Sequence, residues 1–389
     1  MFKEKTAFTK ENSAALKGIA ILMMVFHHCF ADPSRYEAFS INFAPFGEHW
    51  VCLVSYTFKM CVSLFAFVTG FGLYLSLKGL NKENNWSRRE IVKWTTTRYI
   101  KTMSGFWFIA VIAYIVCQLI NGYTYDSFFT GDSVSDMVLG LFRMGLNFFG
   151  IEQLFYGNEF CPTWWYMTIA VLFIVAAPIF VKLFDKFSVI PVLAVAFFLP
   201  RVLQIPYDSS TYIAFQFPFL FGMIAAKYNI LPRVANYKWI RGKLGVLNKP
   251  VKFIVMFVLC FVCIYIYKVL PAKYYYELRF SVFPMVLIFF AYEFLLDLVV
   301  LRKVLEFLGK HSMNIFLTHT FIRYNYCNEF IYSFKYWWLI PLVLICVSLA
   351  LSIVIELVKK LIRYDLFTKQ LLKMANKGVD KMFDSFARQ

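Results

Sequence analysis

Long apolar runs recur along the chain, and short polar or basic segments separate them. Most runs are about 17–25 residues long, the length at which an α-helix crosses a lipid bilayer. The pattern predicts an all-α fold, a polytopic helical bundle with about ten membrane spans. We expect these spans near residues 14–30, 50–77, 99–120, 163–183, 188–203, 211–228, 252–270, 279–300, 312–327 and 337–358.

Some of the apolar stretches are not simple spans. The first, fifth and ninth predicted spans are short, and we expect them to be tilted or partly re-entrant. A further aromatic stretch at 134–151 is interrupted by Arg143 and by glycines, which is typical of an interfacial helix. We predict a single membrane domain over 1–389, with spans over 14–358 and a basic cytoplasmic tail over 359–389.

Lys and Arg residues are concentrated on one side of the predicted bundle. If the N-terminus is cytoplasmic, the spans leave both termini and the loops 78–101, 182–187, 227–252 and 301–311 inside. Together with Lys17 near the start of the first span, these segments hold 31 of the 40 Lys and Arg residues. Cytoplasmic segments of membrane proteins carry such an excess of positive charge. We therefore predict an N-in/C-in topology.

The composition agrees with a membrane protein. The chain is 60% hydrophobic and 20% aromatic, with a mean hydropathy of +0.61. The net charge of +17 comes mostly from the predicted cytoplasmic segments. It therefore indicates anionic membrane lipid as a partner and gives no support for nucleic acid. The nine cysteines lie mostly in apolar spans and do not indicate a disulfide framework.

Two adjacent histidines end the first predicted span, in the stretch LKGIAILMMVFHH. His28 follows Lys17 by eleven positions, about 16 Å along a helix axis, so we expect His28 at or beyond the membrane midplane. Ionisable side chains at that depth are costly and are functional by default. The alternative is that His27 and His28 only form hydrogen bonds between helices. Asn12 or Ser13 is expected to cap this helix, with its first residue at position 14.

A metal site is not expected. Consecutive helix residues point about 100° apart, so His27 and His28 cannot hold one ion as two residues four positions apart do. The other three histidines are scattered along the chain, and no carboxylate cluster accompanies them within the spans. Cys260 and Cys263 have CxxC spacing, but they lie in the apolar run VMFVLCFVCIYIY and are interpreted as packing residues.

Several motifs, taken in order, resemble those of the membrane acyltransferase-3 family. The first helix of that family carries a basic residue, ten further residues and a histidine, which Lys17 and His28 match. Its second-helix Ser-Gly-Phe element resembles SLFAFVTGFGLYL, where Thr69 replaces the serine. The stretches RYIK, PTWWYMTIAVLF and GKHSMNIFLTH, the last ending at His319, resemble later elements of the family. The resemblance runs from about residue 13 to 325.

The resemblance implies a membrane-bound O-acyltransferase that modifies cell-surface carbohydrate. We expect a multi-pass enzyme of the bacterial plasma membrane. The implied donor is a cytoplasmic acyl-CoA, expected to be acetyl-CoA, and the implied acceptor is a polysaccharide or lipid-linked sugar. No tightly bound cofactor and no metal is expected.

The resemblance also assigns roles to individual residues. His28 is the implied catalytic residue, as general base or as acyl relay. The basic residues Lys17, Arg98 and Lys101 lie at the predicted cytoplasmic mouth and suit the phosphates of CoA. Supporting roles are expected for three further residues, and each also has a plain packing interpretation. They are His27, His319 and Thr69.

The chain departs from the family pattern in two places, and two other functions stay open. Many relatives carry a glutamate shortly after the tryptophan-aromatic pair, and MTIAVLF has none. Lys101 stands where a second arginine is common, which keeps the charge but loses the guanidinium fork. The alternatives are a transporter with His27 and His28 on its path, and a membrane sensor without catalysis. No inverted repeat supports a transporter.

Overall fold

The computed structural model describes residues 4–80, 85–129, 131, 133–157, 160–205, 211–269 and 278–387. These residues form helices joined by turns, with one isolated bridge between Asn42 and Tyr336 and no β-strand. The all-α prediction is confirmed for this part of the chain. The chain divides into two compact units: unit 1 contains residues 1–76, 183–312 and 327–346, and unit 2 contains 77–182, 313–326 and 347–389.

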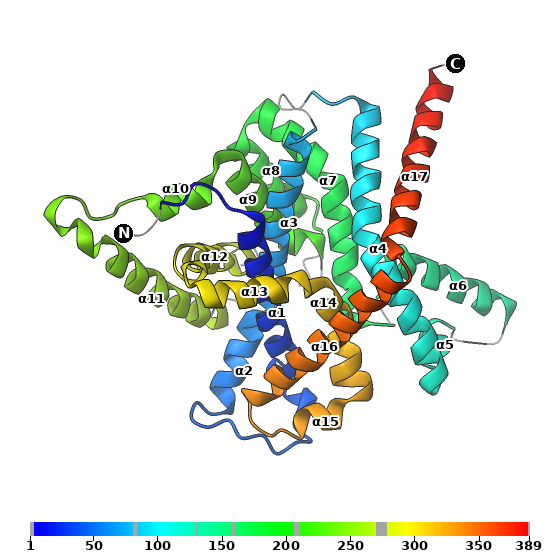
Figure 1. The fold of residues 1–389 in the computed structure, drawn as a ribbon, viewed down its shortest axis with the longest axis horizontal. Helices are drawn as coiled ribbons and strands as arrows, with labels where there is room; N and C mark the ends of the chain where they lie inside the picture. The colour runs from blue at the N-terminus through cyan, green and yellow to red at the C-terminus, as the bar shows by residue number, and fades with distance from the viewer. Residues whose placement is uncertain are drawn as a thin grey trace. The chain divides into compact units, whose positions relative to one another are not determined.

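Figure 1 shows the helices of both units. Those wholly or mainly in unit 1 are α1 (Lys10–Phe30), α2 (Glu48–Thr57), α3 (Cys61–Lys78), α8 (Val189–Val202), α9 (Tyr212–Tyr228), α10 (Ile230–Asn236), α11 (Asn248–Val269), α12 (Phe283–Glu293), α13 (Val299–Lys310) and α15 (Asn328–Tyr332). Those wholly or mainly in unit 2 are α4 (Arg88–Asn121), α5 (Tyr123–Phe128), α6 (Val134–Phe148), α7 (Trp165–Phe187), α14 (Ser312–Thr320), α16 (Leu339–Leu361) and α17 (Tyr364–Phe386).

Seven of the described helical segments are long and apolar enough to cross a membrane, or eight if α9 and α10, which meet at a 73° bend, form one span. The predicted count of about ten is not confirmed. The fifth predicted span is α8, whose 14 residues extend about 21 Å, less than the roughly 30 Å of hydrocarbon. The ninth is α14, which has 9 residues and passes into a π-helical turn over Phe321–Tyr326.

The first helix begins earlier than predicted. The N-cap of α1 is Thr9, whose hydroxyl accepts a hydrogen bond from the backbone N–H of Asn12, so the helix starts at Lys10 and not at residue 14. Threonine at this position satisfies one of the unpaired N–H groups of the first turn. Asn12 and Ser13 therefore lie inside the helix. The 21 residues of α1 extend about 31 Å, enough to cross a bilayer.

Two glycines let α1 and α13 cross at close range. A Cβ added at Gly18 would lie 2.9 Å from Cα of Leu305, and one added at Gly309 would lie 3.1 Å from the backbone nitrogen of Gly18. Real Cβ atoms need more room than this, so the crossing requires glycine on both helices. The sequence prediction left residues 301–311 as a basic loop, and the structure shows that most of this loop is helical.

A second glycine pair joins α3 to α9. A Cβ at Gly70 would lie 2.9 Å from the carbonyl carbon of Phe219, and one at Gly222 would lie 2.9 Å from that of Phe67. Small residues bring helix backbones together in this way where apolar burial alone gives no preference. Gly70 belongs to the second-helix element noted in the sequence, and close packing explains its presence.

Charged side chains fix the N-terminal segment of unit 1 at one end of α11 and α12. Lys5 Nζ lies 2.9 Å from Asp297 Oδ1, and Lys249 Nζ lies 2.9 Å from the other carboxylate oxygen. Beside them Lys252 Nζ lies 2.6 Å from Glu293 Oε1, with side-chain exposures of 0% and 6%. Burial lowers the pKa of Lys5. The N-terminal segment and part of loop 227–252 thus lie at the same end of unit 1, and the N-in/C-in topology stays a prediction.

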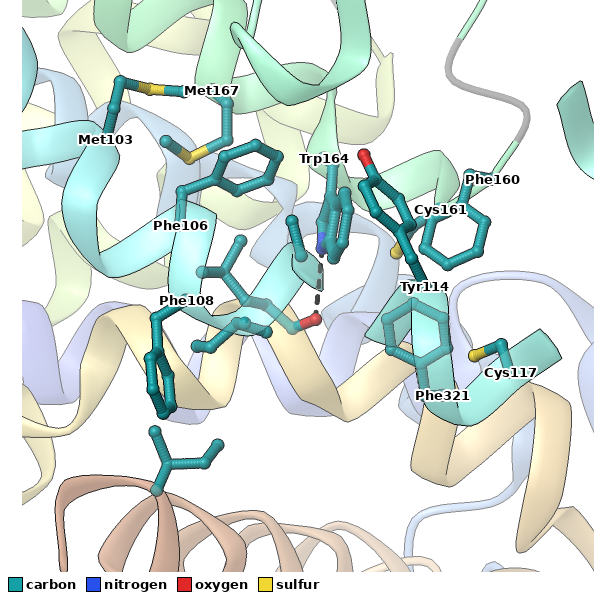
Figure 2. Packing of buried hydrophobic residues seen from close by; sticks show 14 of the residues in the cluster. Met103, Phe106, Phe108, Tyr114, Cys117, Phe160, Cys161, Trp164, Met167 and Phe321 are labelled. Atoms are coloured by element: carbon teal, nitrogen blue, oxygen red, sulfur yellow. Dashed lines mark hydrogen bonds between the residues drawn. The ribbon is translucent and has the colours of Figure 1, made fainter. Parts of the chain in front are cut away.

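The core of unit 2 is built around Trp164. Its indole N–H donates to the carbonyl of Leu317, 3.1 Å away, and its ring packs against Phe106 with 4.8 Å between centroids (Figure 2). Phe160 and Phe321 close the other sides of the ring at 5.5 and 5.8 Å. The tryptophan-rich stretch of the sequence therefore provides the centre of this core.

In unit 2, α17 returns along the first half of α4 in the opposite direction (Figure 1). The Tyr364 hydroxyl donates to the carbonyl of Ser104, and at the far end Lys93 Nζ lies 2.6 Å from Asp380 Oδ1. Hydrogen bonds from Lys93 and Arg89 lower the pKa of Asp380. The tail predicted as basic and cytoplasmic is therefore largely a helix, and its C-terminal end lies beside the start of α4.

Candidate functional site

The two adjacent histidines lie in the last turn of α1, as the sequence predicts. Arg35 Nη1 donates to the carbonyls of His27 and His28, at 3.1 and 3.2 Å. The last carbonyls of a helix have no partner within it and carry a partial negative charge, so this guanidinium stabilises the helix end. The backbone that carries both imidazoles is fixed by these bonds.

The two imidazoles have different surroundings. His27 Nδ1 is 2.8 Å from the carbonyl of Ser55 on α2, and because a carbonyl only accepts, this nitrogen carries the proton. The Ser55 hydroxyl in turn donates to the carbonyl of Phe26. His27 therefore ties α1 to α2, which matches the packing interpretation of this residue. The His28 ring is half-buried, with 5.2 Å between the centroids of the two rings.

Lys17 and Thr69 are the other predicted site residues of unit 1. Lys17 is half-buried on α1, next to the crossing with α13, and in the described part of the chain it forms no ion pair with a carboxylate. An unpaired lysine in such surroundings is available to an anion. Thr69 is half-buried on α3 and directly precedes Gly70 of the α3–α9 crossing.

Arg98 and Lys101 lie one turn apart on α4, in unit 2. Arg98 is half-buried, and its guanidinium carbon lies 5.9 Å from the centroid of the Trp94 ring. Lys101 is exposed. His28 and Lys17 belong to unit 1, so the predicted set is divided between the two units.

His319 is the predicted site residue that is most deeply buried, with 0% exposure. Its Nδ1 lies 2.9 Å from the carbonyl of Phe316, so this nitrogen carries the proton. The opposite nitrogen, Nε2, lies 3.4 Å from the Thr320 hydroxyl, which is 3.0 Å from that of Thr163. Thr163 lies 3.4 Å from the Cys161 sulfur. His319 thus ends a buried chain of polar side chains within unit 2.

Comparison with known families identifies the chain. A family model described as an acyltransferase domain matches residues 13–357. The chain belongs to the acyltransferase-3 family. Comparisons with curated proteins and with solved structures found no match. Together with the long apolar helices, the family match supports a membrane acyltransferase.

Sequence reasoning missed a buried carboxylate in unit 2 of this acyltransferase. Glu152 is 2% exposed, and one of its oxygens accepts a hydrogen bond from the Asn147 amide. The Tyr114 hydroxyl, 2.6 Å from Asn147 Oδ1, extends this network. Glu152 lies between two predicted spans, in a segment that also carries Asp132 and Glu159, and these two lie outside the described residues. Nothing in the local sequence separates a buried loop carboxylate from an exposed one.

A second omission is Arg279 in unit 1. It lies on a π-helical turn over Leu278–Val282, directly before α12, and is 5% exposed. The sequence showed this arginine only as the first residue of a predicted span, where basic residues usually extend to the membrane surface. A buried arginine and a surface arginine at the end of a span have the same sequence pattern, so the sequence alone does not separate them.

The described residues of the acyltransferase contain no group of three or more potential metal ligands. All nine cysteines are free thiols, and Cys260 and Cys263 lie on α11 one turn apart.

Proposed function

We propose that this protein transfers an acyl group, expected to be acetyl, from cytoplasmic acyl-CoA to a hydroxyl of a cell-envelope or exported carbohydrate. The family match over residues 13–357 is the observation that carries the proposal. The proposed location is the plasma membrane of a bacterium. No tightly bound cofactor is part of the proposal, since the acyl donor supplies the reactive thioester.

His28 is the proposed general base. It takes the proton of the acceptor hydroxyl as the oxygen attacks the thioester carbonyl, and the CoA thiolate leaves and is then protonated. The Arg35 bonds to the end of α1 support this role, because they hold the backbone of His28 in one position. An acyl relay through the His28 imidazole would use the same residue and differs only in a covalent intermediate.

Lys17, Arg98 and Lys101 are the proposed ligands of the CoA phosphates. CoA carries several negative charges, and cations on helices near a membrane surface are suited to hold them. Lys17 and Lys101 form no ion pair with a carboxylate among the described residues, which leaves their charges available. Thr69 and His319 are proposed as supporting residues, the latter through its Nε2 and the Thr320 hydroxyl.

The experiment compares wild type with His28→Ala and His27→Ala in membrane vesicles from the native host. Labelled acetyl is followed from acetyl-CoA into carbohydrate, with protein level and insertion measured in parallel. We expect a loss of at least about 100-fold for His28→Ala, the usual contribution of a general base. His27→Ala, the matched control, should keep most activity.

Other outcomes assign the function differently. Transfer that persists in a well-inserted His28→Ala protein would remove His28 from the site. If the wild type neither transfers acetyl nor hydrolyses acetyl-CoA, the enzyme proposal fails. The transporter and the sensor would then be separated by measuring substrate uptake into the vesicles.

A further inference from the structure

Arg279 is a buried cation of unit 1. It is 5% exposed, and its Nε atom has no hydrogen-bond partner among the described residues. No carboxylate of the described residues forms an ion pair with its guanidinium. A charged group taken out of water is destabilising unless it is paired, so a buried arginine in this state calls for an anion.

Two tyrosine rings border the guanidinium. Its central carbon lies 4.0 Å from the centroid of Tyr267 and 5.8 Å from that of Tyr56, and the two rings are 5.9 Å apart. Tyr267 is buried, whereas Tyr56 is 45% exposed, so the cluster reaches the molecular surface at Tyr56. Cation–π contacts compensate only part of the lost hydration, and they leave the Nε–H donor in the guanidinium plane without a partner among the described residues.

The backbone beneath Arg279 is also unusual. The residue lies in a π-helical turn over Leu278–Val282, and such turns are rare and occur frequently at functional sites. The side chain is moreover an arginine, whose planar fork matches two oxygens of a carboxylate or phosphate. Three features therefore coincide: burial, an Nε–H donor without a partner among the described residues, and an irregular helical turn.

The position of Arg279, Tyr267 and Tyr56 within unit 1 indicates which substrate binds there. Lys249 near the start of α11 pairs with Asp297, whereas Tyr267 near the end of α11 contacts Arg279. The residues 249 and 267 are about 27 Å apart along the helix, which is nearly the thickness of the hydrocarbon core. With the basic end of the unit predicted as cytoplasmic, Arg279 faces the outer side, where an exported carbohydrate is found.

We propose that Arg279, bordered by Tyr267 and Tyr56, binds an oxyanion, phosphate or carboxylate, carried by the carbohydrate acceptor. The guanidinium holds the anionic group, and the exposed Tyr56 ring packs against the sugar. The identity of the ligand as acceptor rests on the proposed acyltransferase function, whereas the binding of an oxyanion does not.

The test measures thermal unfolding of the purified full-length protein in detergent. Glucose 1-phosphate and glucuronate are the anionic probes, and glucose is the uncharged one. A ligand that binds only the folded protein raises the melting temperature with concentration. We expect both anions, and not glucose, to stabilise the wild type. Arg279→Gln should weaken the apparent affinity at least tenfold, while Arg233→Gln, at an exposed arginine of α10, should leave it unchanged.

Two further variants keep the test decisive if Arg279→Gln does not fold. Arg279→Lys keeps the positive charge but loses the planar guanidinium fork. Tyr56→Leu removes an exposed aromatic ring and leaves the Arg279 side chain itself unchanged. Both should weaken anion binding several-fold. Equal anion-dependent shifts in all variants, or no shift in the wild type, would overturn the proposal.

The source of the oxyanion is settled in nanodiscs. In phosphatidylcholine alone the sugar anions should stabilise the protein as in detergent. If added phosphatidylglycerol stabilises the wild type but not Arg279→Gln and removes the sugar effect, the site binds a lipid headgroup and the acceptor assignment is wrong. In the transfer assay, Arg279→Gln should raise the KM for carbohydrate and leave the KM for acetyl-CoA unchanged. A wild type without transfer refutes the proposed function and leaves the anion-binding result intact.

Discussion

The crossing of α3 and α9 gives the most direct test of the packing in unit 1. In Gly70→Ala the new Cβ meets the carbonyl carbon of Phe219 at 2.9 Å and the ring carbon Cδ2 of the same residue at 3.1 Å. Carbon–carbon contacts are ordinarily about 3.5–4.0 Å, so the two backbones must separate by roughly 1 Å. The carbonyl belongs to the helix backbone and cannot rotate away.

That separation has a predictable cost. A gap of about 1 Å along a packed interface loses up to half of the dispersion energy of the contacts that face it. Overpacking in cores usually costs about 1–3 kcal/mol, which is roughly a 5- to 150-fold change in the unfolding equilibrium. The position Gly72 provides a matched control on the same helix, because nothing lies within 4 Å of its added Cβ.

The assay uses the buried thiols of the chain. Cys29, Cys61 and Cys263 are buried in unit 1, and Cys117 and Cys161 are buried in unit 2, so a thiol-reactive dye reports the unfolding of both units on heating. We expect Gly70→Ala to lower the melting temperature and Gly72→Ala to leave it unchanged or raise it slightly. A Gly70→Ala protein that melts with the wild type, or a Gly72→Ala protein that melts as early as Gly70→Ala, would refute the reasoning.

Two further predictions concern charged pairs. Lys252→Met leaves Glu293 buried without its cation and should lower the stability of unit 1 by about 3–5 kcal/mol. The double variant Lys252→Met with Glu293→Leu should lose less stability, measured by the same thermal unfolding. An equal or larger loss of stability in the double variant would contradict this prediction. Asp380→Asn should increase amide exchange along α17, and Asp365→Asn, whose partner Lys369 is on the same helix, should not. Because pairing lowers the pKa of Asp380, the stability that this pair contributes is present above about pH 4 and is lost as the pH falls through the lowered pKa. If neither acid nor Asp380→Asn changes the amide-exchange protection of α17, the pairing is contradicted.

The sequence predicted the long helices because a helix within lipid must be apolar over its whole length. The predictions were wrong where a helix is not both apolar and long enough to cross the lipid. Residues 301–311 and the C-terminal tail are too polar to form spans, and their helices α13 and α17 are held by contacts with α1 and α4. Conversely, α8 and α14 are apolar but are too short for regular spans.

The sequence alone could predict the geometry of the candidate site only for residues that lie on the same helix. The spacing from Lys17 to His28 lies within one helix, and the structure confirms that helix. Thr163 and Thr320 meet although 157 positions separate them, and Tyr56 meets Arg279 across more than half the chain. Such pairs depend on how helices pack, which one sequence without homologues does not reveal.

The pairing of α17 with α4 also has a consequence for biosynthesis. Arg89 and Asp380 are 291 positions apart, so at about 5–20 residues per second the ribosome needs roughly 15–60 s to supply the partner of α4. During that interval the first half of α4 has no α17 to pack against. In unit 1, Asp297 is synthesised after its partner Lys5 by a similar interval. A chain arrested before residue 297 is made would leave Lys5 without this partner, and one arrested before residue 380 would leave the start of α4 without the salt bridges of α17.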